Sequence, residues 1–329
     1  MTSIKDVAIE AGVSTATVSR VLANKGSFKA DTRDKILSAI AKLNYRPNLI
    51  ARSLRVQTST KIGLLVSDIR NPFFTAIARA VEDAAYARGY SVIMCNTDEN
   101  PEKEALYLDL MRDENVAGVI FSPTQQFNAT HVQHPTHIPF VIIDRTVNEG
   151  EFDWVQLDNY AAAYELTEHL LAQGYRKLAG LFGDTSSTGF ERKKGFLAAL
   201  AAHQLEPIAT QLMPPRLAHG FDATQALLAQ NPRPDAIFTS NSLLTAGAFQ
   251  ALRTHKIAIP QEIGLVGFDE TTWSELVEPA ITLIAQPTEE IGHSAVELLF
   301  QRIQEPERAH RKVILQGTLR IHASSMRNF

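Results

Sequence analysis

The residues best suited to bind a small molecule stand at or near the ends of short apolar segments. They are Asn71, Asp144, Arg145, Arg192, Asn241 and Asp269. Carboxylate, amide and guanidinium groups form hydrogen bonds to pairs of hydroxyl groups. The aromatic residues Phe73, Phe74 and Trp273 could cover the apolar face of a sugar ring, although a core or interface role for Phe74 and Trp273 fits the sequence equally well. We therefore expect a site for a small polyhydroxylated ligand.

The sequence offers no comparable arrangement for catalysis. His131, His134 and His137 in "HVQHPTH" have metal-ligand chemistry, but Pro135 breaks a helix between them, so a solvated loop is favoured. "GLFGDTSSTG" has neither the GxGxxG nor the Walker lysine pattern. Cys95 ends the apolar run "YSVIMC", where a small buried thiol is favoured over a nucleophile. We expect a protein that is not an enzyme and that needs neither cofactor nor metal.

Seven apolar runs must position the ligand-binding residues. They are "KIGLLVS", "YSVIMC", "AGVIFS", "PFVIID", "KLAGLF", "DAIFTS" and "IGLVGF". Their alternation with amphipathic helical stretches favours parallel sheets flanked by helices. The residues after position 60 are numerous enough for two such α/β subdomains, and ligands of these folds lie at the carboxyl ends of the strands.

Charge is distributed unevenly along the chain. Its net charge is -4, but residues 1–60 hold ten Lys and Arg against four Asp and Glu, and the remainder holds 22 against 32. This split favours a polyanionic partner for the N-terminal segment, although a solvated surface can also produce it. One cysteine excludes an internal disulfide framework, and we find neither a secretory signal nor an apolar run of ~18 residues. We expect a cytoplasmic protein without a membrane partner.

The basic N-terminal segment begins with small and apolar residues at helical spacing. They are Ile4, Val7, Ala8 and Ala11, which predict a helix over residues 4–11. Gly12 ends it, because glycine adopts a left-handed backbone at low cost. Ser14 is a good N-cap for a second helix that starts at Thr15. Two short helices joined by so tight a turn predict a helix-turn-helix.

A third helix, at roughly residues 32–43, is expected to close the core of this segment. It carries Ile36, Leu37, Ile40 and Leu43 at helical spacing. Short side chains on the second helix would let it enter a major groove, where Arg20 can reach guanine or a phosphate. Helical hairpins without a DNA role are common, so this pattern alone leaves a purely structural role open.

The segments "IKDVAIEAGVSTATVSRVL" and "NYRPNLIARSLR" resemble the headpiece and hinge helix of the LacI/GalR family of repressors. The resemblance continues through "KIGLLVSDIRNPFF", "VQLDNYAAAYELTEHLLAQGYRKLAGLFG", "ERKKGF", "IPQEIGLVGFDE" and "PAITLIAQP", in the family's order and spacing. It implies a headpiece (1–46), a hinge helix and linker (47–60), and an effector-binding and dimerisation domain (61–329). That domain would be a two-lobed, periplasmic-binding-protein-like clamp with three chain crossings.

The resemblance also implies which residues contact DNA. After the capping Ser14, Thr15 and Ala16 would select bases, with Arg20 as a further contact. Thr17, Ser19, Asn24 and the backbone near Ile4 would contact phosphates. The hinge is flanked by Tyr45 and Asn48 and includes Ala51, Arg52, Leu54 and Arg55. Leu54 would wedge between base pairs in the minor groove, beside Arg52 and Arg55 on the DNA backbone, although a linker leucine that only touches the body remains an alternative.

Two positions depart from the family pattern. Lys29 stands where many relatives have a serine cap, so Asp31 or Thr32 is expected to cap the third helix. Ser242 replaces an acid in "TSNS" and, with Arg145 and Arg192, slightly favours an anionic ligand.

Together these observations predict a homodimeric repressor that binds a pseudo-palindromic double-stranded operator. Its effector is expected to be a sugar, a sugar acid or a sugar phosphate. A nucleobase or nucleoside effector is the alternative, and a solute-binding protein without a DNA role is the alternative of a different class.

Overall fold

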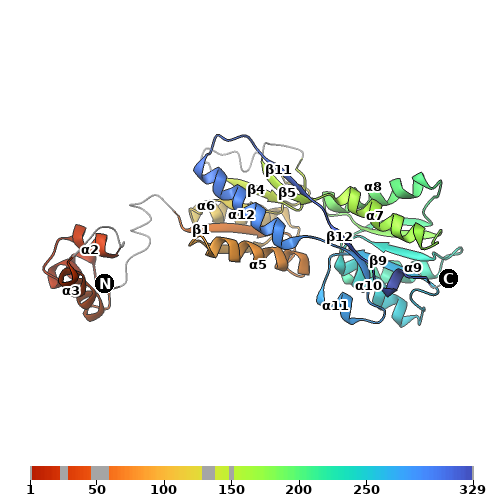
Figure 1. Ribbon diagram of the computed structural model, residues 1–329, viewed down its shortest axis with the longest axis horizontal. Helices are drawn as coiled ribbons and strands as arrows, with labels where there is room; N and C mark the ends of the chain where they lie inside the picture. The colour runs from red at the N-terminus through yellow and green to blue at the C-terminus, as the bar shows by residue number, and fades with distance from the viewer. Residues whose placement is uncertain (1, 23–28, 46–58, 128–137, 148–151, 328–329) are drawn as a thin grey trace. The chain divides into compact units, whose positions relative to one another are not determined.

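The computed structural model describes residues 2–22, 29–45, 59–127, 138–147 and 152–327. It divides into two compact units, Met1–Ser59 and Thr60–Phe329. We call the first the head and the second the body, and describe each by itself (Figure 1).

The described part of the head contains three helices, α1 (Ile4–Glu10), α2 (Thr15–Leu22) and α3 (Ala30–Lys42). Ser3 and Asp6 form a capping box at the start of α1. Gly12 has a φ of 66°, as expected for the residue that ends this helix region. The backbone N–H of Thr17 donates to Ser14 Oγ at 3.1 Å, which confirms the predicted N-cap of α2.

The predicted start of α3 is wrong. The helix begins at Ala30, and Lys29 is its N-cap residue without a side-chain hydrogen bond. The Lys29 carbonyl nevertheless accepts from the backbone N–H groups of Thr32 and Arg33, at 3.0 and 3.3 Å. The main chain therefore starts the helix without a capping side chain, and neither Asp31 nor Thr32 is needed for that role.

The buried face of α3 also differs from the expectation at one position. Ile36 and Ala39 are buried, and Ile40 and Leu43 pack at the edge of the same core, whereas Leu37 is 48% exposed. Adjacent residues of a helix point about 100° apart, so Leu37 lies off the face that Ile36 defines. The remaining core residues of the head are Val7, Ala8, Ala11, Val18 and Val21.

The body has two lobes, each built on a six-stranded sheet. The sheet of the first lobe has the order β11-β5-β4-β3-β1-β2, and all of its strand pairs are parallel. Its strands are β1 (Lys61–Val66), β2 (Ser91–Asn96), β3 (Val119–Phe121), β4 (Phe140–Ile143), β5 (Asp153–Leu157) and β11 (Lys312–Leu315).

The second sheet repeats this arrangement in the order β12-β10-β9-β8-β6-β7. Its strands are β6 (Leu178–Gly183), β7 (Ala209–Met213), β8 (Ala236–Thr239), β9 (Gly264–Phe268), β10 (Thr282–Ala285) and β12 (Thr318–Arg320). Strand β12 runs antiparallel to β10, an exception to the parallel sheets expected from the sequence. In the order of strands, β9 of this lobe corresponds to β4 of the first.

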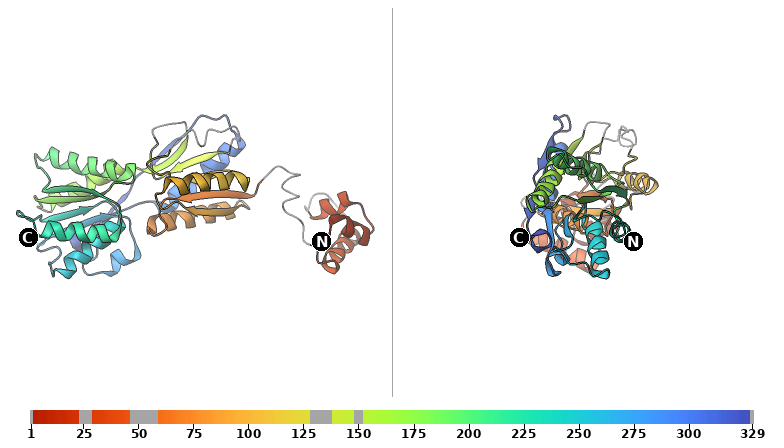
Figure 2. Two further views of the ribbon diagram at one scale, coloured as in Figure 1. Left: turned by 180° about the vertical axis from the view of Figure 1, so that it is seen from behind. Right: turned by 90° about the vertical axis from the view of Figure 1, so that its right-hand side faces the viewer.

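Helices flank both sheets (Figure 2). In the first lobe they are α5 (Pro72–Tyr86), α6 (Pro101–Asp113) and α12 (Thr288–Gln304). In the second they are α7 (Asn159–Ala172), α8 (Ser187–Ala202), α9 (Leu217–Leu228), α10 (Ser242–Thr254), α11 (Thr272–Leu276) and the 3-10 helix η2 (Ala323–Ser325). Separate apolar cores hold each lobe's helices against its sheet.

The chain crosses between the lobes three times, as expected. It passes from β5 to α7, from β10 to α12 and from β11 to β12. The two lobes belong to one compact unit, and residues that follow strands of both sheets line one pocket.

Three further features bear on function. Within the described ranges, no helix combines the length and the apolar character needed to cross a bilayer. The same residues contain no group of His, Cys, Asp and Glu arranged to hold a metal ion, and His131, His134 and His137 lie outside them. Cys95 is half-buried on β2, and burial raises the pKa of its thiol, which disfavours the reactive thiolate.

Candidate functional site

The exposed face of α2 carries short side chains and one arginine. Thr15, Ala16, Ser19 and Arg20 are exposed, while Val18 and Val21 are buried in the core of the head. This arrangement gives the helix a face on which no bulky side chain blocks close approach. Arg20 lies in the last turn of that helix.

The other predicted DNA-contacting residues divide into two groups. Thr17 is half-buried, and its hydroxyl lies 2.9 Å from Ser14 Oγ, while Ile4 and Tyr45 are half-buried at the edge of the core of the head. The second group lies outside the described residues. It comprises Asn24, Asn48, Ala51, Arg52, Leu54 and Arg55.

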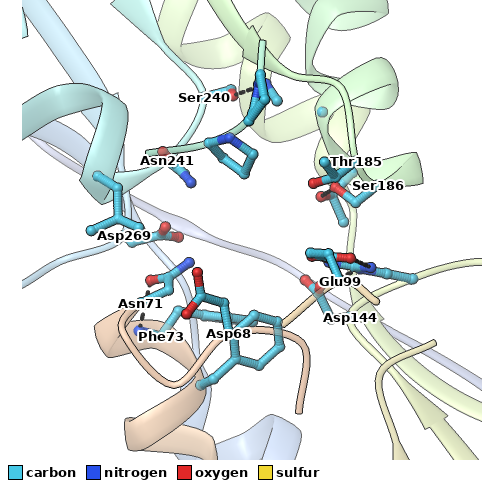
Figure 3. A pocket seen from close by; sticks show the side chains of 18 of the residues that line it. Asp68, Asn71, Phe73, Glu99, Asp144, Thr185, Ser186, Ser240, Asn241 and Asp269 are labelled. Carbon is cyan, nitrogen blue, oxygen red and sulfur yellow. Dashed lines mark hydrogen bonds and ion pairs between the residues drawn. The ribbon is translucent and has the colours of Figure 1, made fainter. Parts of the chain in front are cut away.

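The body contains a pocket that both lobes line (Figure 3). It encloses about 750 Å³, including space open to solvent at its mouth, which is in the range of small-molecule sites. It brings together eight of the nine residues predicted to contact the effector. They are Asn71, Phe73, Phe74, Asp144, Arg145, Arg192, Asn241 and Asp269.

Trp273 is the predicted residue that the structure does not place on this pocket. It is half-buried in α11, where its ring packs 6.3 Å from that of Phe249. Sequence proximity to Asp269 suggested a pocket position, but the Trp273 side chain packs against an apolar core of the second lobe. Phe73 and Phe74 do line the pocket and are also core residues, in edge-to-face contact at 5.1 Å.

Two asparagines fix helix starts at the pocket. Asn71 Oδ1 accepts from the backbone N–H of Phe73 at the start of α5, and Asn241 Oδ1 accepts from that of Leu244 at the start of α10. Ser242 Oγ donates to Asn71 Oδ1 at 3.3 Å, so this departure from the family pattern joins the two lobes. The backbone N–H of Ser242 donates to Asp269 Oδ2 at 3.2 Å.

Arg192 is held from three sides. Its Nε donates to Asn159 Oδ1 at 2.8 Å, its Nη1 donates to the carbonyl of Ser240, and its guanidinium lies 4.1 Å over the Phe268 ring. Burial lowers the pKa of Arg192, although the charges of Asp269 and Asp144 oppose this effect. Among the described residues, no protein group accepts from Nη2, which leaves those donors for the pocket.

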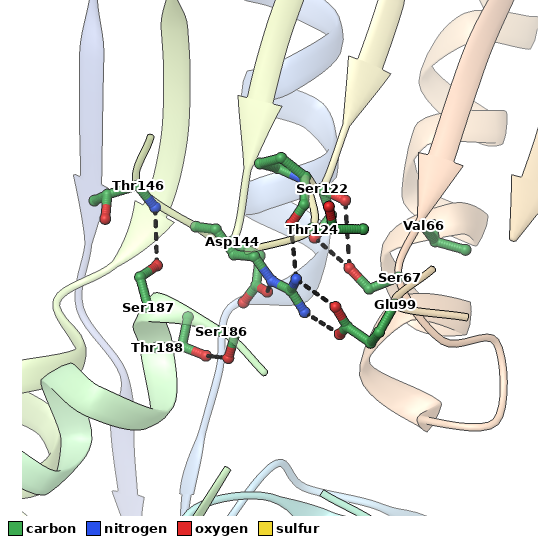
Figure 4. A network of polar contacts seen from close by, with 12 residues as sticks. Val66, Ser67, Glu99, Ser122, Thr124, Asp144, Thr146, Ser186, Ser187 and Thr188 are labelled. Atoms are coloured by element: carbon green, nitrogen blue, oxygen red, sulfur yellow. Dashed lines mark hydrogen bonds and ion pairs between the residues drawn. The ribbon is translucent and has the colours of Figure 1, made fainter. Parts of the chain in front are cut away.

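Arg145 is held differently, by a bidentate ion pair with Glu99 (Figure 4). Its Nη1 donates to Glu99 Oε2 at 2.8 Å, and its Nη2 donates to Glu99 Oε1. Beside it, burial raises the pKa of Asp144, while Arg145 and Arg192 act in the opposite direction. Asp144 and Asp269 follow the corresponding strands β4 and β9, and both have left-handed backbones with φ of 68° and 69°. Such strain is typical of functional positions.

Several pocket residues were missed in the sequence. They include Glu99, Thr185, Ser186, Thr188, Arg216 and Gln286. Gln286 Nε2 donates to Asp269 Oδ1 at 2.5 Å. Gln286 follows β10, a strand that was not among the apolar runs identified in the sequence. Glu99 follows β2, and its place after that strand was the available signal. Thr185 Oγ1 is buried without a hydrogen-bond partner among the described residues, so a ligand hydroxyl could satisfy it.

The pocket is therefore rich in paired donors and acceptors and nearly balanced in charge. Its lining has the carboxylates of Asp68, Glu99, Asp144 and Asp269 against three guanidinium groups. Such a site forms many directed hydrogen bonds to hydroxyl groups. Each of the two buried guanidinium groups lies near a carboxylate, Arg145 beside Glu99 and Arg192 near Asp144 and Asp269, whereas the third, Arg216, is exposed.

Two family models match the chain. The model described as bacterial regulatory proteins, lacI family, matches residues 3–48. The model described as periplasmic binding proteins and sugar binding domain of LacI family matches residues 59–323. Together they cover the head and nearly the whole body.

Individual proteins match over more than nine-tenths of their length. The chain is 40% identical to the ribose operon repressor of Halalkalibacterium halodurans over 93% of this chain and 91% of that protein. It is 34% identical to the HTH-type transcriptional repressor PurR of Edwardsiella ictaluri over 92% of this chain and 91% of that protein. It superposes on the lac repressor dimer bound to operator and the anti-inducer ONPF with a TM-score of 0.90, at 26% identity and 99% coverage of both chains.

Proposed function

Since this chain belongs to the LacI family of bacterial regulatory proteins, we propose that it is a repressor whose affinity for its operator is controlled by a neutral sugar. As a family member it is a DNA-binding transcriptional repressor and not an enzyme. The effector, the assembly and the roles of individual residues belong to the proposal.

In the DNA-binding part of the proposal, α2 enters the major groove. Its exposed Thr15 and Ala16 select bases, and Arg20 reaches guanine or a phosphate. The exposure of these three side chains supports this role. The basic charge of the N-terminal segment, ten Lys and Arg against four Asp and Glu in residues 1–60, supports the contacts to DNA phosphates.

The observation that carries the effector proposal is the pairing of charges in the pocket. Arg145 is bound to Glu99, and Arg192 lies near Asp144 and Asp269, so the two buried arginines do not form an anion site. This favours a neutral polyhydroxylated ligand over the sugar acid or sugar phosphate that the arginines alone suggested. D-ribose is our first candidate, because the relative at 40% identity is named a ribose operon repressor. Among the described lining residues, Phe73 and Phe74 are the only aromatic partners for a nucleobase, and both are core residues.

The proposed assembly is a homodimer in the cytoplasm. A dimer bound to operator is the form of the lac repressor on which this chain superposes. Two heads would read half-sites about one helical turn apart, and a protein that binds operator DNA shares the compartment of the chromosome. Ligand in the pocket would change the orientation of the two lobes relative to each other, and this change would alter the affinity of the paired heads for the operator. A coupling free energy of ~1–3 kcal/mol is sufficient.

A thermal-shift screen tests the effector proposal most directly. Full-length protein is unfolded in the presence of neutral pentoses and hexoses, sugar acids, sugar phosphates and nucleobases. We expect a neutral sugar, with D-ribose first, to raise the melting temperature through preferential binding to the folded state. A shift by nucleobases alone would contradict the sugar proposal. A protein lacking residues 1–60 should retain the ligand response and lose DNA binding.

A further inference from the structure

Arg145 has little hydrogen-bonding capacity left for a ligand. A guanidinium group has five N–H donors. Nε donates to Asp144 Oδ2 at 3.4 Å, Nη1 donates to Glu99 Oε2 at 2.8 Å and to the Pro123 carbonyl at 2.7 Å, and Nη2 donates to Glu99 Oε1. Among the described residues, this leaves one N–H of Nη2 without a protein acceptor. The ion pair with Glu99 also fixes the plane of the guanidinium group, and so the direction of that donor.

The backbone that presents Glu99 is strained. Asp98 and Glu99 are consecutive non-glycine residues with left-handed conformations, at φ of 53° and 59°. Such a conformation is strained for a residue with a side chain and persists only where its surroundings determine it. Asn96 Nδ2 and Lys103 Nζ both donate to the Asp98 carboxylate, at 2.9 and 2.5 Å, and the backbone N–H of Glu99 donates to the Ser67 carbonyl at 3.2 Å. These contacts hold a corner that turns the Glu99 carboxylate toward Arg145.

The pair is shielded from water. The side chains of Arg145 and Glu99 are 6% and 19% exposed, so their mutual attraction is screened much less than that of a surface pair. Burial by itself would lower the pKa of Arg145, but the hydrogen bonds and charge of Glu99, with the charge of Asp144, outweigh it and raise the pKa. Arg145 therefore stays cationic, and the Glu99 carboxylate compensates its charge at contact distance.

We propose that Glu99 is a specificity-determining residue of the pocket. Because Glu99 compensates the charge of Arg145, the pocket selects neutral sugars over anionic ones. Without this carboxylate, Arg145 would lose its bidentate partner, and only Asp144, whose Oδ2 lies 3.4 Å from Arg145 Nε, would offset its charge toward the ligand. The inference rests on the proposed function for the class of ligand. It assigns a role to Glu99, which lines the pocket but was not among the polar residues identified in the sequence.

The test uses full-length wild-type protein and three variants. Glu99→Gln removes the charge, and Glu99→Asp keeps it on a shorter side chain. Glu114→Gln is the matched control, because Glu114 pairs with Lys61 on the surface, at 2.7 Å, and does not line the pocket. Each protein is unfolded thermally in sodium sulfate and in sodium chloride of equal ionic strength, and is titrated calorimetrically with D-ribose in both salts.

We expect sulfate to stabilise Glu99→Gln more than chloride does, and to weaken its binding of D-ribose about tenfold, because Arg145 without its bidentate partner attracts the anion. Wild type, Glu99→Asp and Glu114→Gln should share one smaller sulfate effect, which reflects the general exclusion of sulfate from protein surfaces. A loss of folding alone would not produce competition between sulfate and D-ribose.

If Glu99→Gln responds to sulfate as wild type does, the inference is overturned. Wild-type protein provides a second test that does not depend on the variants, because it should bind D-ribose more tightly than D-ribose 5-phosphate, and the reverse preference would also overturn the inference. Failure of wild type to bind any sugar would refute the proposed effector class. The sulfate-dependent shift of Glu99→Gln would still decide whether Glu99 compensates Arg145.

Discussion

Replacing Arg192 by lysine separates the stability that this side chain provides from its proposed role toward the ligand. Arg192→Lys keeps the positive charge but loses the planar fork that reaches Asn159 Oδ1 and the Ser240 carbonyl at the same time. It also loses the flat contact over the Phe268 ring. The pocket would then keep its charge balance while losing the directed donors of Nη2.

The contacts that are lost set the expected size of both effects. One buried acceptor left unpaired costs about 1–3 kcal/mol, and the lost stacking costs roughly 1 kcal/mol more. We expect the free energy of unfolding to fall by about 2–4 kcal/mol, which lowers the melting temperature of a body of this size by roughly 4–16 °C. A charged hydrogen bond to the ligand is worth about 1.5–3 kcal/mol, so sugar affinity should fall about 10- to 150-fold.

Calorimetric titration with the sugar, together with thermal unfolding, distinguishes the two roles. The matched control is Arg302→Lys, because Arg302 is equally buried and donates from Nε to Asp153 Oδ2 at 3.0 Å, but does not line the pocket. It should lose stability and keep its sugar affinity. If Arg192→Lys is destabilised and binds the sugar as tightly as wild type, Arg192 is a core residue only, and the reasoning about its free donors is wrong.

Three further predictions concern the head and the pH response. Leu54→Ala should weaken specific operator binding in a gel shift and leave sugar binding unchanged, because the wedge it removes acts only on DNA; an unaltered midpoint would speak against the wedge. Changing Thr15 and Ala16 together should alter the operator sequence selected from a random library, with little change in salt dependence, and selection of the wild-type sequence would refute base reading. Burial lowers the pKa of His169 below its ordinary 6.5, and its ring lies 2.7 Å from Ser325 Oγ. The unfolded chain therefore binds the proton more readily, so the free energy of unfolding should fall as pH drops below about 6.5. His169→Gln should have a shallower dependence in chemical denaturation at several pH values, and an equal slope would contradict this assignment.

The features that local sequence determines were predictable. The start of α2 depends on Ser14 and the end of the preceding helix region on Gly12, and both act within a few residues of their own positions. The carboxyl ends of apolar strands similarly identified Asp144 and Asp269, because parallel strands deliver their last residues to one edge of a sheet.

The features that were missed depend on contacts between distant segments. The position of Glu99 after β2 indicated the edge of the sheet, but its partner Arg145 is 46 residues away, and no local pattern predicts that ion pair. Leu37 has the residue type of a core position, but the packing of α3 on two other helices decides which face is buried. Trp273 was assigned to the pocket from its neighbours in sequence, whereas the direction of α11 places it against Phe249.

The central claim is that occupancy of the pocket sets the affinity of the heads for DNA. The most direct test is a titration of full-length protein into a labelled operator, selected from a random library, with and without a saturating concentration of the sugar that raises its melting temperature. We expect the two operator affinities to differ by at least about fivefold. Equal affinities, or no preference for the selected operator over random duplex in either condition, would contradict the claim.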